Sequence, residues 1–173
     1  RGTSVEDVQW SPTESTVFST ADCNGTIAIF DTRKPGNHML SHKISETDVN
    51  VIGWNPNVSN LLASGDDDGI FCVWDLRKFG KDPLARFNSH TRAITSLEWH
   101  PSDESMIVVS DESAVFIYDL SIEEDIEDTS SQNDTNRTPQ NKIPPQLLFM
   151  HCGSTSNKEA HWHPQIPSMC MTT

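Results

Sequence analysis

The stretch from Ser121 to Gly153 contains the residues with the clearest capacity for chemistry. Six carboxylates between residues 123 and 134 have no Lys or Arg among them. Carboxylates at this density attract basic partners and repel anionic ones. The five that we assign to a partner-binding acidic loop are Glu123, Glu124, Asp125, Glu127 and Asp128.

An apolar run follows the acidic loop. Pro144 and Pro145 restrict the backbone, and the residues after them read as the outer strand of a sheet. A charged loop held by a rigid turn beside an apolar strand predicts a groove for an amphipathic basic helix. We assign this groove to Pro144, Pro145, Leu147, Leu148 and Phe149. The simpler alternative is an acidic loop that only keeps the chain soluble.

Two arginines occur in matching contexts, in the segments FDTR and WDLR. Arg33 and Arg77 each follow an Asp by two residues. A guanidinium at this place can pair with a carboxylate of its own repeat, or it can contact a partner protein. The sequence leaves both roles open.

Other reactive residue types do not form a recognisable site. His161 and His163 share one face of a predicted strand, but the sequence places no third ligand, and structural zinc needs four. The GDDDG segment at residues 65–69 does not have the spacing of a calcium-binding loop. The sequence also shows no phosphate-binding loop or nucleophile motif. We therefore predict no metal, no cofactor and no enzymatic activity.

The composition narrows the classes of partner. The chain has 173 residues and a formal net charge of −13, from 12 Lys plus Arg and 25 Asp plus Glu. This charge argues against direct binding to nucleic acid or to anionic membranes, and no apolar run is long enough to span a bilayer. The four cysteines are far apart in apolar segments, which predicts reduced thiols in a cytosolic or nuclear protein. The start at Arg1 rather than at a Met suggests an excised piece of a longer protein.

The elements that position these residues form an internal repeat. Tryptophan recurs in VQWSP, IGWNP, LEWHP and AHWHP, at positions 10, 54, 99 and 162. An aromatic–Asp pair closes a strand-like segment at residues 30–31, 74–75 and 118–119. The Trp intervals are 44, 45 and 63 residues, so the third is 63 − 44 = 19 residues longer than the first. The acidic loop accounts for this excess and is therefore an insertion into a regular array.

Each period reads as four short antiparallel strands joined by tight turns. A period of this length and pattern is typical of a β-propeller blade. Three blades and part of a fourth cannot close a ring, so apolar blade faces should be exposed. We predict an all-β, incomplete propeller with a first blade at 1–44, a second at 45–88, a third at 89–152 with its insertion at 121–143, and the start of a fourth at 153–173.

The blade period and the literal Trp-Asp pair at residues 74–75 resemble the WD-repeat family. The resemblance implies that the chain is the C-terminal part of a seven-bladed ring. In that family a loop His, a strand Ser, a turn Asp and a strand Trp form a hydrogen-bond network within a blade. Here the network is only partly kept, and no blade has the complete set. The second blade has Ser64, Asp68 and Trp74 but Ser45 at the His position, the third has His90 but Glu112 where the turn Asp belongs, and the first has Asn24 at that place.

A closer resemblance is carried by SVEDVQWSP, WDLRK and the acidic insertion that ends in PPQLLFMH. These segments are similar to the glutamate-rich WD-repeat proteins of ribosome assembly and to the related retinoblastoma-binding histone chaperones. In the chaperones, an acidic loop, a Pro-Pro and a Leu-Leu-Phe strand form part of a pocket for a histone helix. Their top face holds basic peptides, which implies a second site here at Glu6, Asp48 and Asn50.

These observations predict a non-enzymatic acidic chaperone or scaffold that binds histones or a large-subunit ribosomal protein in ribosome biogenesis. Such a protein would act in the nucleus, in particular the nucleolus, and also in the cytoplasm. The alternative is a substrate receptor of a cullin-4 ubiquitin ligase. Such receptors have a similar Trp-Asp-x-Arg pattern, which implies that Arg33 and Arg77 contact the ligase adaptor. A third interpretation is a structural segment whose binding surfaces lie elsewhere in a longer protein.

Overall fold

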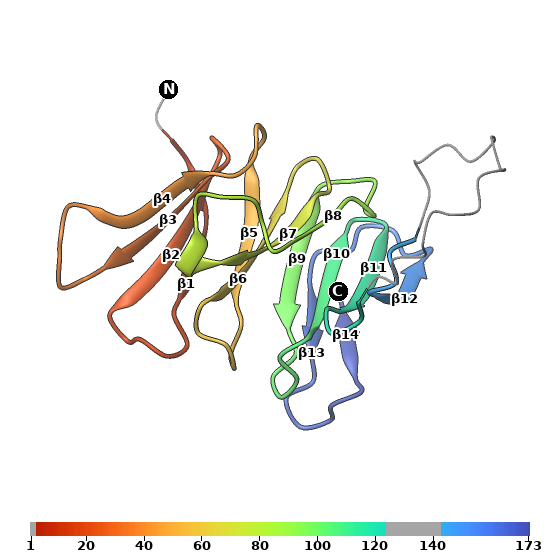
Figure 1. Ribbon diagram of the computed structural model, residues 1–173. Helices are drawn as coiled ribbons and strands as arrows, with labels where there is room; N and C mark the ends of the chain where they lie inside the picture. The colour runs from red at the N-terminus through yellow and green to blue at the C-terminus, as the bar shows by residue number, and fades with distance from the viewer. Residues whose placement is uncertain (1–2, 124–142) are drawn as a thin grey trace, which may run out of the picture.

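The structure is a computed structural model that describes residues 3–123 and 143–173. Four residues of the predicted acidic loop, Glu124, Asp125, Glu127 and Asp128, lie outside this part of the chain. The described residues form four antiparallel sheets that follow one another in chain order (Figure 1). No helix in the described part is long and apolar enough to cross a membrane.

Each of the first three sheets is a four-stranded meander, which is the form of a propeller blade. The first blade contains β1 (Val5–Trp10), β2 (Val17–Asp22), β3 (Thr26–Asp31) and β4 (His38–Lys43). The second contains β5 (Val49–Trp54), β6 (Leu61–Asp66), β7 (Phe71–Asp75) and β8 (Ala85–Phe87), with a short 3-10 helix η1 (Leu76–Lys78) after β7. The third contains β9 (Ile94–Trp99), β10 (Met106–Asp111), β11 (Ala114–Asp119) and β12 (Leu147–Cys152).

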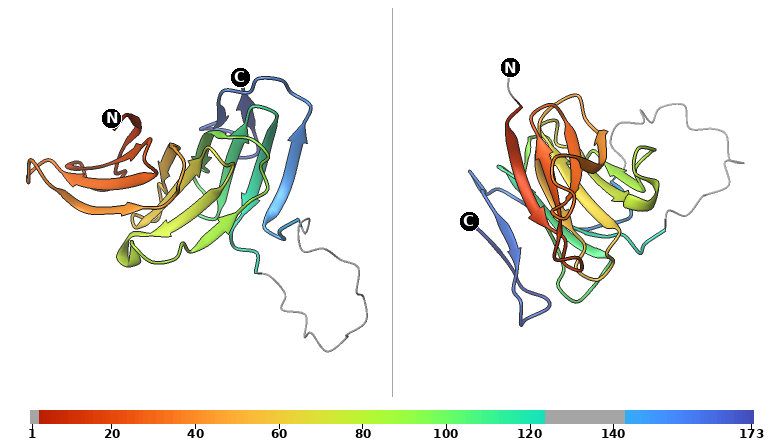
Figure 2. Two further views of the ribbon diagram at one scale, coloured as in Figure 1. Left: turned by 90° about the horizontal axis from the view of Figure 1, so that it is seen from above. Right: turned by 90° about the vertical axis from the view of Figure 1, so that its left-hand side faces the viewer.

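The fourth sheet is a hairpin of β13 (Ala160–Trp162) and β14 (Cys170–Thr172). The first strands of successive sheets contact one another, from β1 through β5 and β9 to β13, so these strands line the inner side of an open arc. Figure 2 shows the sheets side by side in this order. The predicted all-β, incomplete propeller is confirmed.

The hydrophobic cores lie between blades. Val17, Ile27 and Ile29 of the first blade pack with residues of the second that include Leu62 and Trp74. A second core joins the second blade to the third, and a smaller one joins the third to the hairpin of the fourth. Strands β6 and β7 are buried on both faces because a blade covers each side, and each large apolar side chain so buried contributes about 1.5–3 kcal/mol.

A carboxylate organises the middle hairpin of the second blade. Asp66 accepts the backbone N–H of Ile70 at 2.9 Å and the hydroxyl of Ser45 at 2.8 Å. Nearby, the indole N–H of Trp74 donates to the Ser64 hydroxyl at 2.9 Å. Asp68 is exposed. The prediction that position 68 supplies the turn carboxylate is therefore wrong, and Asp66 has that role.

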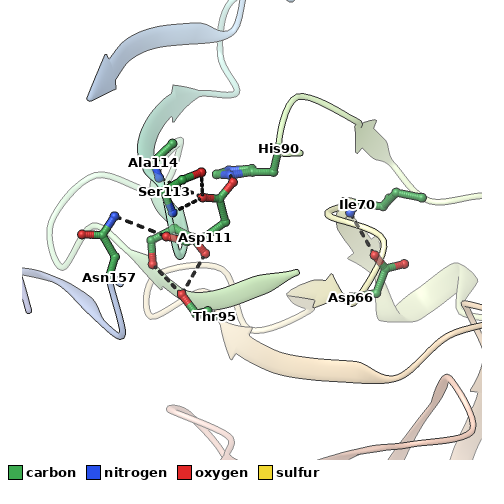
Figure 3. Close-up of polar contacts among 9 residues, drawn as sticks. Asp66, Ile70, His90, Thr95, Asp111, Ser113, Ala114 and Asn157 are labelled. Atoms are coloured by element: carbon green, nitrogen blue, oxygen red, sulfur yellow. Dashed lines mark hydrogen bonds and ion pairs between the residues drawn. The ribbon is translucent and has the colours of Figure 1, made fainter. Parts of the chain in front are cut away.

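The third blade has an equivalent carboxylate, which Figure 3 shows among its partners. His90 Nδ1 lies 2.9 Å from Asp111 Oδ2, while Asp111 Oδ1 accepts the backbone N–H groups of Ser113 and Ala114 at 2.6 and 2.8 Å. The expectation that Glu112 replaces the turn carboxylate is also wrong. Its side chain instead pairs at the surface with an arginine of the preceding loop.

The cause of both errors is that the carboxylate belongs to the last residue of the strand before the turn, Asp66 of β6 and Asp111 of β10, and not to the turn itself. The turns also differ in length. In the third blade Ser110 pairs with Val115, whereas in the second Gly65 pairs with Phe71, so the third turn is one residue shorter. Matching the blades at their aromatic–Asp pairs therefore misplaces the turn. The first blade follows the same rule, because Asp22, rather than residue 24, accepts the N–H of Thr26 at 2.9 Å.

Candidate protein-interaction surfaces

The acidic insertion leaves and re-enters the third blade through a hydrogen-bonded neck. The side-chain amide of Gln146 donates to the carbonyl of Ile122 at 2.8 Å, and the carbonyl of Gln146 accepts the N–H of Asp119 at 2.8 Å. Asp119 accepts the Ser121 hydroxyl at 2.6 Å, and this bond holds the pKa of the carboxyl below its usual value. A turn closed by the Leu147 N–H and the Pro144 carbonyl, 3.0 Å apart, then starts β12.

The predicted groove residues fall on and beside β12, the outermost strand of the third blade. The predicted strand is confirmed, but its residues differ in exposure. Leu147 pairs with Tyr118 and packs on the core, and a register shift follows it. Leu148 and Phe149 are 50% and 55% exposed on this edge strand. Met150, which sequence reasoning missed, is 47% exposed. The structure thus describes an apolar outer edge rather than an enclosed groove.

The two prolines and the first acidic residue lie at the same end of the blade. Pro144 is half-buried, Pro145 is exposed, and Glu123 is exposed at the exit of the neck. Partner binding by the loop and by the edge stays a prediction.

The two arginines adopt the same geometry one blade apart. Arg33 Nη2 lies 2.7 Å from Asp31 Oδ2, and Arg77 Nη2 lies 2.7 Å from Asp75 Oδ2. In each pair the side-chain hydrogen bond from the guanidinium holds the pKa of the carboxyl well below its usual range. The Arg33 and Arg77 side chains are nevertheless 67% and 73% exposed. They pair within their own blades and still present charge to solvent.

The three residues predicted to bind a peptide on the top face have different surroundings. Glu6 is exposed on β1, and Asp48 is half-buried just before β5. Asn50 donates to Asp67 at 2.7 Å and to the carbonyl of Ile94 at 3.3 Å, so its amide connects the second and third blades. A peptide-binding role for these three positions stays a prediction.

A surface that sequence reasoning missed lies along the ends of the inner strands. A cleft of about 470 Å³ is lined there by Trp and Pro residues of three repeats, together with Glu98 and His161. His161 Nδ1 lies 2.8 Å from Glu98 and its Nε2 lies 3.2 Å from Glu159, and these carboxylates, Glu98 foremost, raise the pKa of the imidazole. His163 instead accepts backbone N–H groups of its own turn. The described residues contain no group of three or more His, Cys, Asp or Glu placed to hold a metal ion.

The repeat, the blade architecture and the aromatic–Asp strands define a WD-repeat propeller. The family model for the "WD domain, G-beta repeat" matches residues 35–75 and 81–119. The chain belongs to the WD-repeat proteins, and the resemblance noted from its sequence is confirmed.

Three curated relatives are similar to nearly the whole of this chain. The ribosome assembly protein rrb1 of Schizosaccharomyces pombe is 48% identical over 98% of this chain and 36% of its own length. The glutamate-rich WD repeat-containing protein 1 of Dictyostelium discoideum is 47% identical over 98% of this chain and 35% of its own length. The protein HEAT STRESS TOLERANT DWD 1 of Arabidopsis thaliana is 47% identical over 98% and 38%. The chain spans little more than a third of these relatives.

A solved structure also shares the fold. A chain in the crystal structure of the mitotic checkpoint complex superposes with a TM-score of 0.70 over 93% of this chain and 42% of its own length. At 16% sequence identity, this likeness shows the fold alone.

Proposed function

We propose that this chain is part of a non-enzymatic WD-repeat scaffold or chaperone that binds basic proteins in ribosome biogenesis. Its clients would be histones or a large-subunit ribosomal protein, and it would act in the nucleus and nucleolus and also in the cytoplasm. The observation that carries the proposal is β12, an exposed apolar edge next to the carboxylate-rich insertion. The names of two homologues, a ribosome assembly protein and a glutamate-rich WD-repeat protein, support the same process.

Two physical effects would act together at this surface. Covering Leu148, Phe149 and Met150 with the apolar stripe of a client helix would contribute about 25 cal/mol per Å² of apolar surface removed from water. Lys and Arg on the flanks of that helix would meet the carboxylates of the insertion, which steers association and fixes orientation. Because salt screens exposed charges over about 8 Å at physiological ionic strength, binding should weaken as salt rises.

The test compares the affinity of two variants for purified core histones and for isolated large-subunit ribosomal proteins. In the first variant Glu123, Glu124, Asp125, Glu127 and Asp128 become Ser. The matched control changes five exposed carboxylates elsewhere, Glu14, Glu46, Asp68, Asp82 and Glu104, so that both variants have the same net charge. We expect the first variant to lose about tenfold or more in affinity at moderate salt and the control to lose much less.

The apolar edge is tested separately by Phe149→Ser with Leu148→Ser. Both side chains are about half exposed, so stability should change little while client affinity falls. If the acidic-loop variant and its control bind equally well, charge acts without regard to position and the proposed site is wrong. Binding that does not change with salt would exclude the insertion as the main contact.

A second candidate function rests on the paired arginines. Arg33 and Arg77 repeat one exposed geometry in adjacent blades, as expected for a surface that contacts the adaptor of a cullin-4 ubiquitin ligase. Replacing both with Ala should abolish adaptor binding in a pull-down and leave histone binding intact. Retention of the adaptor by the double variant would eliminate this candidate.

A further inference from the structure

The same backbone arrangement recurs where the third strand of each four-stranded blade ends, at residues 31–33, 75–77 and 119–121, and we call it the blade corner. Each corner begins at the Asp that ends the strand. The residue after this Asp donates its N–H to the carbonyl of the residue that precedes the second strand of the blade. These bonds run from Thr32 to Thr16, from Leu76 to Asn60 and from Leu120 to Ser105, each at 2.9 Å. The carboxylates of Asp31, Asp75 and Asp119 therefore occupy equivalent places.

Two of the blade corners contain a cation of their own, two residues after the Asp. Arg33 donates its backbone N–H to Asp31 Oδ1 at 3.0 Å, and its Nε and Nη2 donate to Asp31 Oδ2 at 3.1 and 2.7 Å. Arg77 binds Asp75 in the same way, at 3.0, 3.1 and 2.7 Å. Asp31 and Asp75 are only 4% and 7% exposed. A carboxylate at this corner is thus placed to bind a guanidinium, which forms parallel hydrogen bonds with both oxygens.

The third blade corner has the same backbone but a hydroxyl in place of the cation. Ser121 stands where the other corners have Arg, and its N–H and hydroxyl donate to Asp119 Oδ1 at 2.9 and 2.6 Å. Ser105, at the same corner, donates its hydroxyl to Asp103 at 2.8 Å. Within residues 3–123 and 143–173, no hydrogen bond or ion pair is made to the other oxygen, Asp119 Oδ2. Asp119 is also half-buried, whereas the two arginine-paired carboxylates are buried.

The third blade corner adjoins the surface that we propose for clients. The N–H of Asp119 donates to the carbonyl of Gln146, which directly precedes β12, and β11 and β12 lie side by side (Figure 1). The amide of Gln146 donates to the carbonyl of Ile122 at 2.8 Å. Asp119 therefore lies between the base of the acidic insertion and the apolar edge. Because the hydrogen bond from Ser121 holds the pKa of Asp119 below its usual value, the carboxyl is charged at neutral pH.

We propose that Asp119 is the residue with which this surface recognises an arginine of its client. The client guanidinium takes the place that Arg33 and Arg77 have in the other two corners. One of its N–H groups donates to Asp119 Oδ2, and a second donates to Oδ1 once the Ser121 hydroxyl turns away. Arginine is preferred to lysine, because a planar guanidinium reaches both oxygens whereas an ammonium acts as a point charge. The inference rests on the proposed function and names one contact within it.

Charge and ligand number identify the occupant of the third corner. A carboxylate that accepts hydrogen bonds on one oxygen only is complementary to a cationic donor. A metal ion needs more ligands than one carboxylate, and the described residues contain no group of three or more His, Cys, Asp or Glu placed to hold one. The chain has two cations of its own in the insertion, Arg137 and Lys142, and the experiment below distinguishes them from a cation of the client.

The test measures binding of the 173-residue chain to two amphipathic helical peptides, with Leu on one face and either Arg or Lys on the other. We expect the Arg peptide to bind at least about fivefold more tightly. Ser121→Arg supplies the missing cation in the geometry of the other corners and leaves every carboxylate in place. It should weaken binding of the Arg peptide by about tenfold and remove the preference for Arg, without lowering the melting temperature. Ser59→Arg, at an exposed serine of the second blade, makes the same change in net charge and should lose much less affinity.

A second variant tests the carboxylate directly. Asp119→Asn keeps the shape of the side chain and an oxygen that can accept the N–H of Ser121, but it removes the charge. Its affinity for the Arg peptide should fall to that for the Lys peptide. A role of Asp119 in stability alone would change the melting temperature and would leave the ratio of the two affinities as it is in the natural chain.

Three results would overturn the inference. The first is equal affinity of the natural chain and Ser121→Arg for the Arg peptide; if the variant with five carboxylates replaced still loses affinity, the proposed function stands without Asp119. The second is a natural chain that binds neither peptide nor histones, which contradicts the proposed function as well. The third is a rise in the pKa of Asp119, followed by NMR, when Arg137 and Lys142 are changed to Ser, because a cation of the chain itself would then occupy the corner.

Discussion

At the scale of single residues, buried carboxylates organise the middle hairpins of the second and third blades. Asp111 lies within hydrogen-bond distance of the His90 imidazole and accepts two backbone N–H groups of its turn. Burial opposes the charge, but the hydrogen bonds from Ser113 and His90 keep the pKa of Asp111 below its usual value. Burial also lowers the pKa of His90, so the pair is a neutral imidazole beside a carboxylate.

The replacement Asp111→Ala should lower the free energy of unfolding by about 3–5 kcal/mol, because it leaves the buried imidazole and the turn N–H groups without their acceptor. Asp68→Ala is the control and should change it by less than about 0.5 kcal/mol, because that side chain is exposed. Urea unfolding followed by tryptophan fluorescence measures both. A larger effect at Asp68 would restore the assignment made from the repeat pattern.

His161 makes the junction between the third and fourth sheets dependent on pH. Its pKa is raised by Glu98 and Glu159, so its contribution to stability is complete below the unfolded-state pKa and is lost as pH rises through the folded-state pKa. The side chain is 51% exposed and solvent screens the pairs, so we expect at most about 1 kcal/mol. The difference in stability between the natural chain and His161→Gln should therefore shrink from about pH 5.5 to about pH 8.5. A difference that grows with pH would contradict this sign.

At the scale of elements, the close approach of neighbouring blades depends on glycines in the strands. A Cβ on Gly65 of β6 would lie 2.6 Å from the Cβ of Ile94, which is part of a stiff β-branched side chain. A Cβ on Gly53 of β5 would lie 2.5 Å from a terminal methyl of Leu97, which can rotate away. An added methyl group would therefore contact a stiff side chain at position 65 and a side chain that can move at position 53.

Gly65→Ala should destabilise the chain by about 1–3 kcal/mol through overpacking between the second and third blades. Gly53→Ala should have a smaller effect because the Leu97 methyl can move. Chemical denaturation of the two variants side by side gives the comparison. An equal loss at both positions would mean that the backbones, and not these side chains, set the spacing of the blades.

At the scale of the whole molecule, the arc of blades has one inner-strand Trp in each repeat but buries them unequally. Trp99 is 3% exposed between two blades, and Trp10 is 58% exposed on the uncovered face. The residue type and its local motif are the same, so the difference arises only from the neighbouring blade.

In the 173-residue chain, Trp99→Ala should lower the free energy of unfolding by about 3–5 kcal/mol, since it removes a buried aromatic ring and a hydrogen bond across the junction. Trp10→Ala should change it by less than about 0.5 kcal/mol. Thermal unfolding followed by circular dichroism can measure both. Comparable losses at the two positions would show that Trp10 already packs against another surface in solution.

The amino-acid sequence by itself determined the elements and their repetition. The Trp and aromatic–Asp markers recur in phase, and alternation of apolar residues forms a strand wherever one face can be buried, so the sheets and the outer strand β12 could be predicted. The paired environment of Arg33 and Arg77 could also be anticipated, because the Asp partners are two residues away.

Only the tertiary structure decided which carboxylate caps each hairpin and which apolar residues remain exposed. The capping role belongs to Asp111 at the end of β10, and strand pairing rather than sequence spacing fixes that register. The contacts of Asn55 with Glu104 and of His100 with Pro167 join residues 49 and 67 positions apart, beyond the reach of a local pattern. Burial depends on whether a neighbouring blade covers the residue, so the same Trp motif is buried in one repeat and exposed in another.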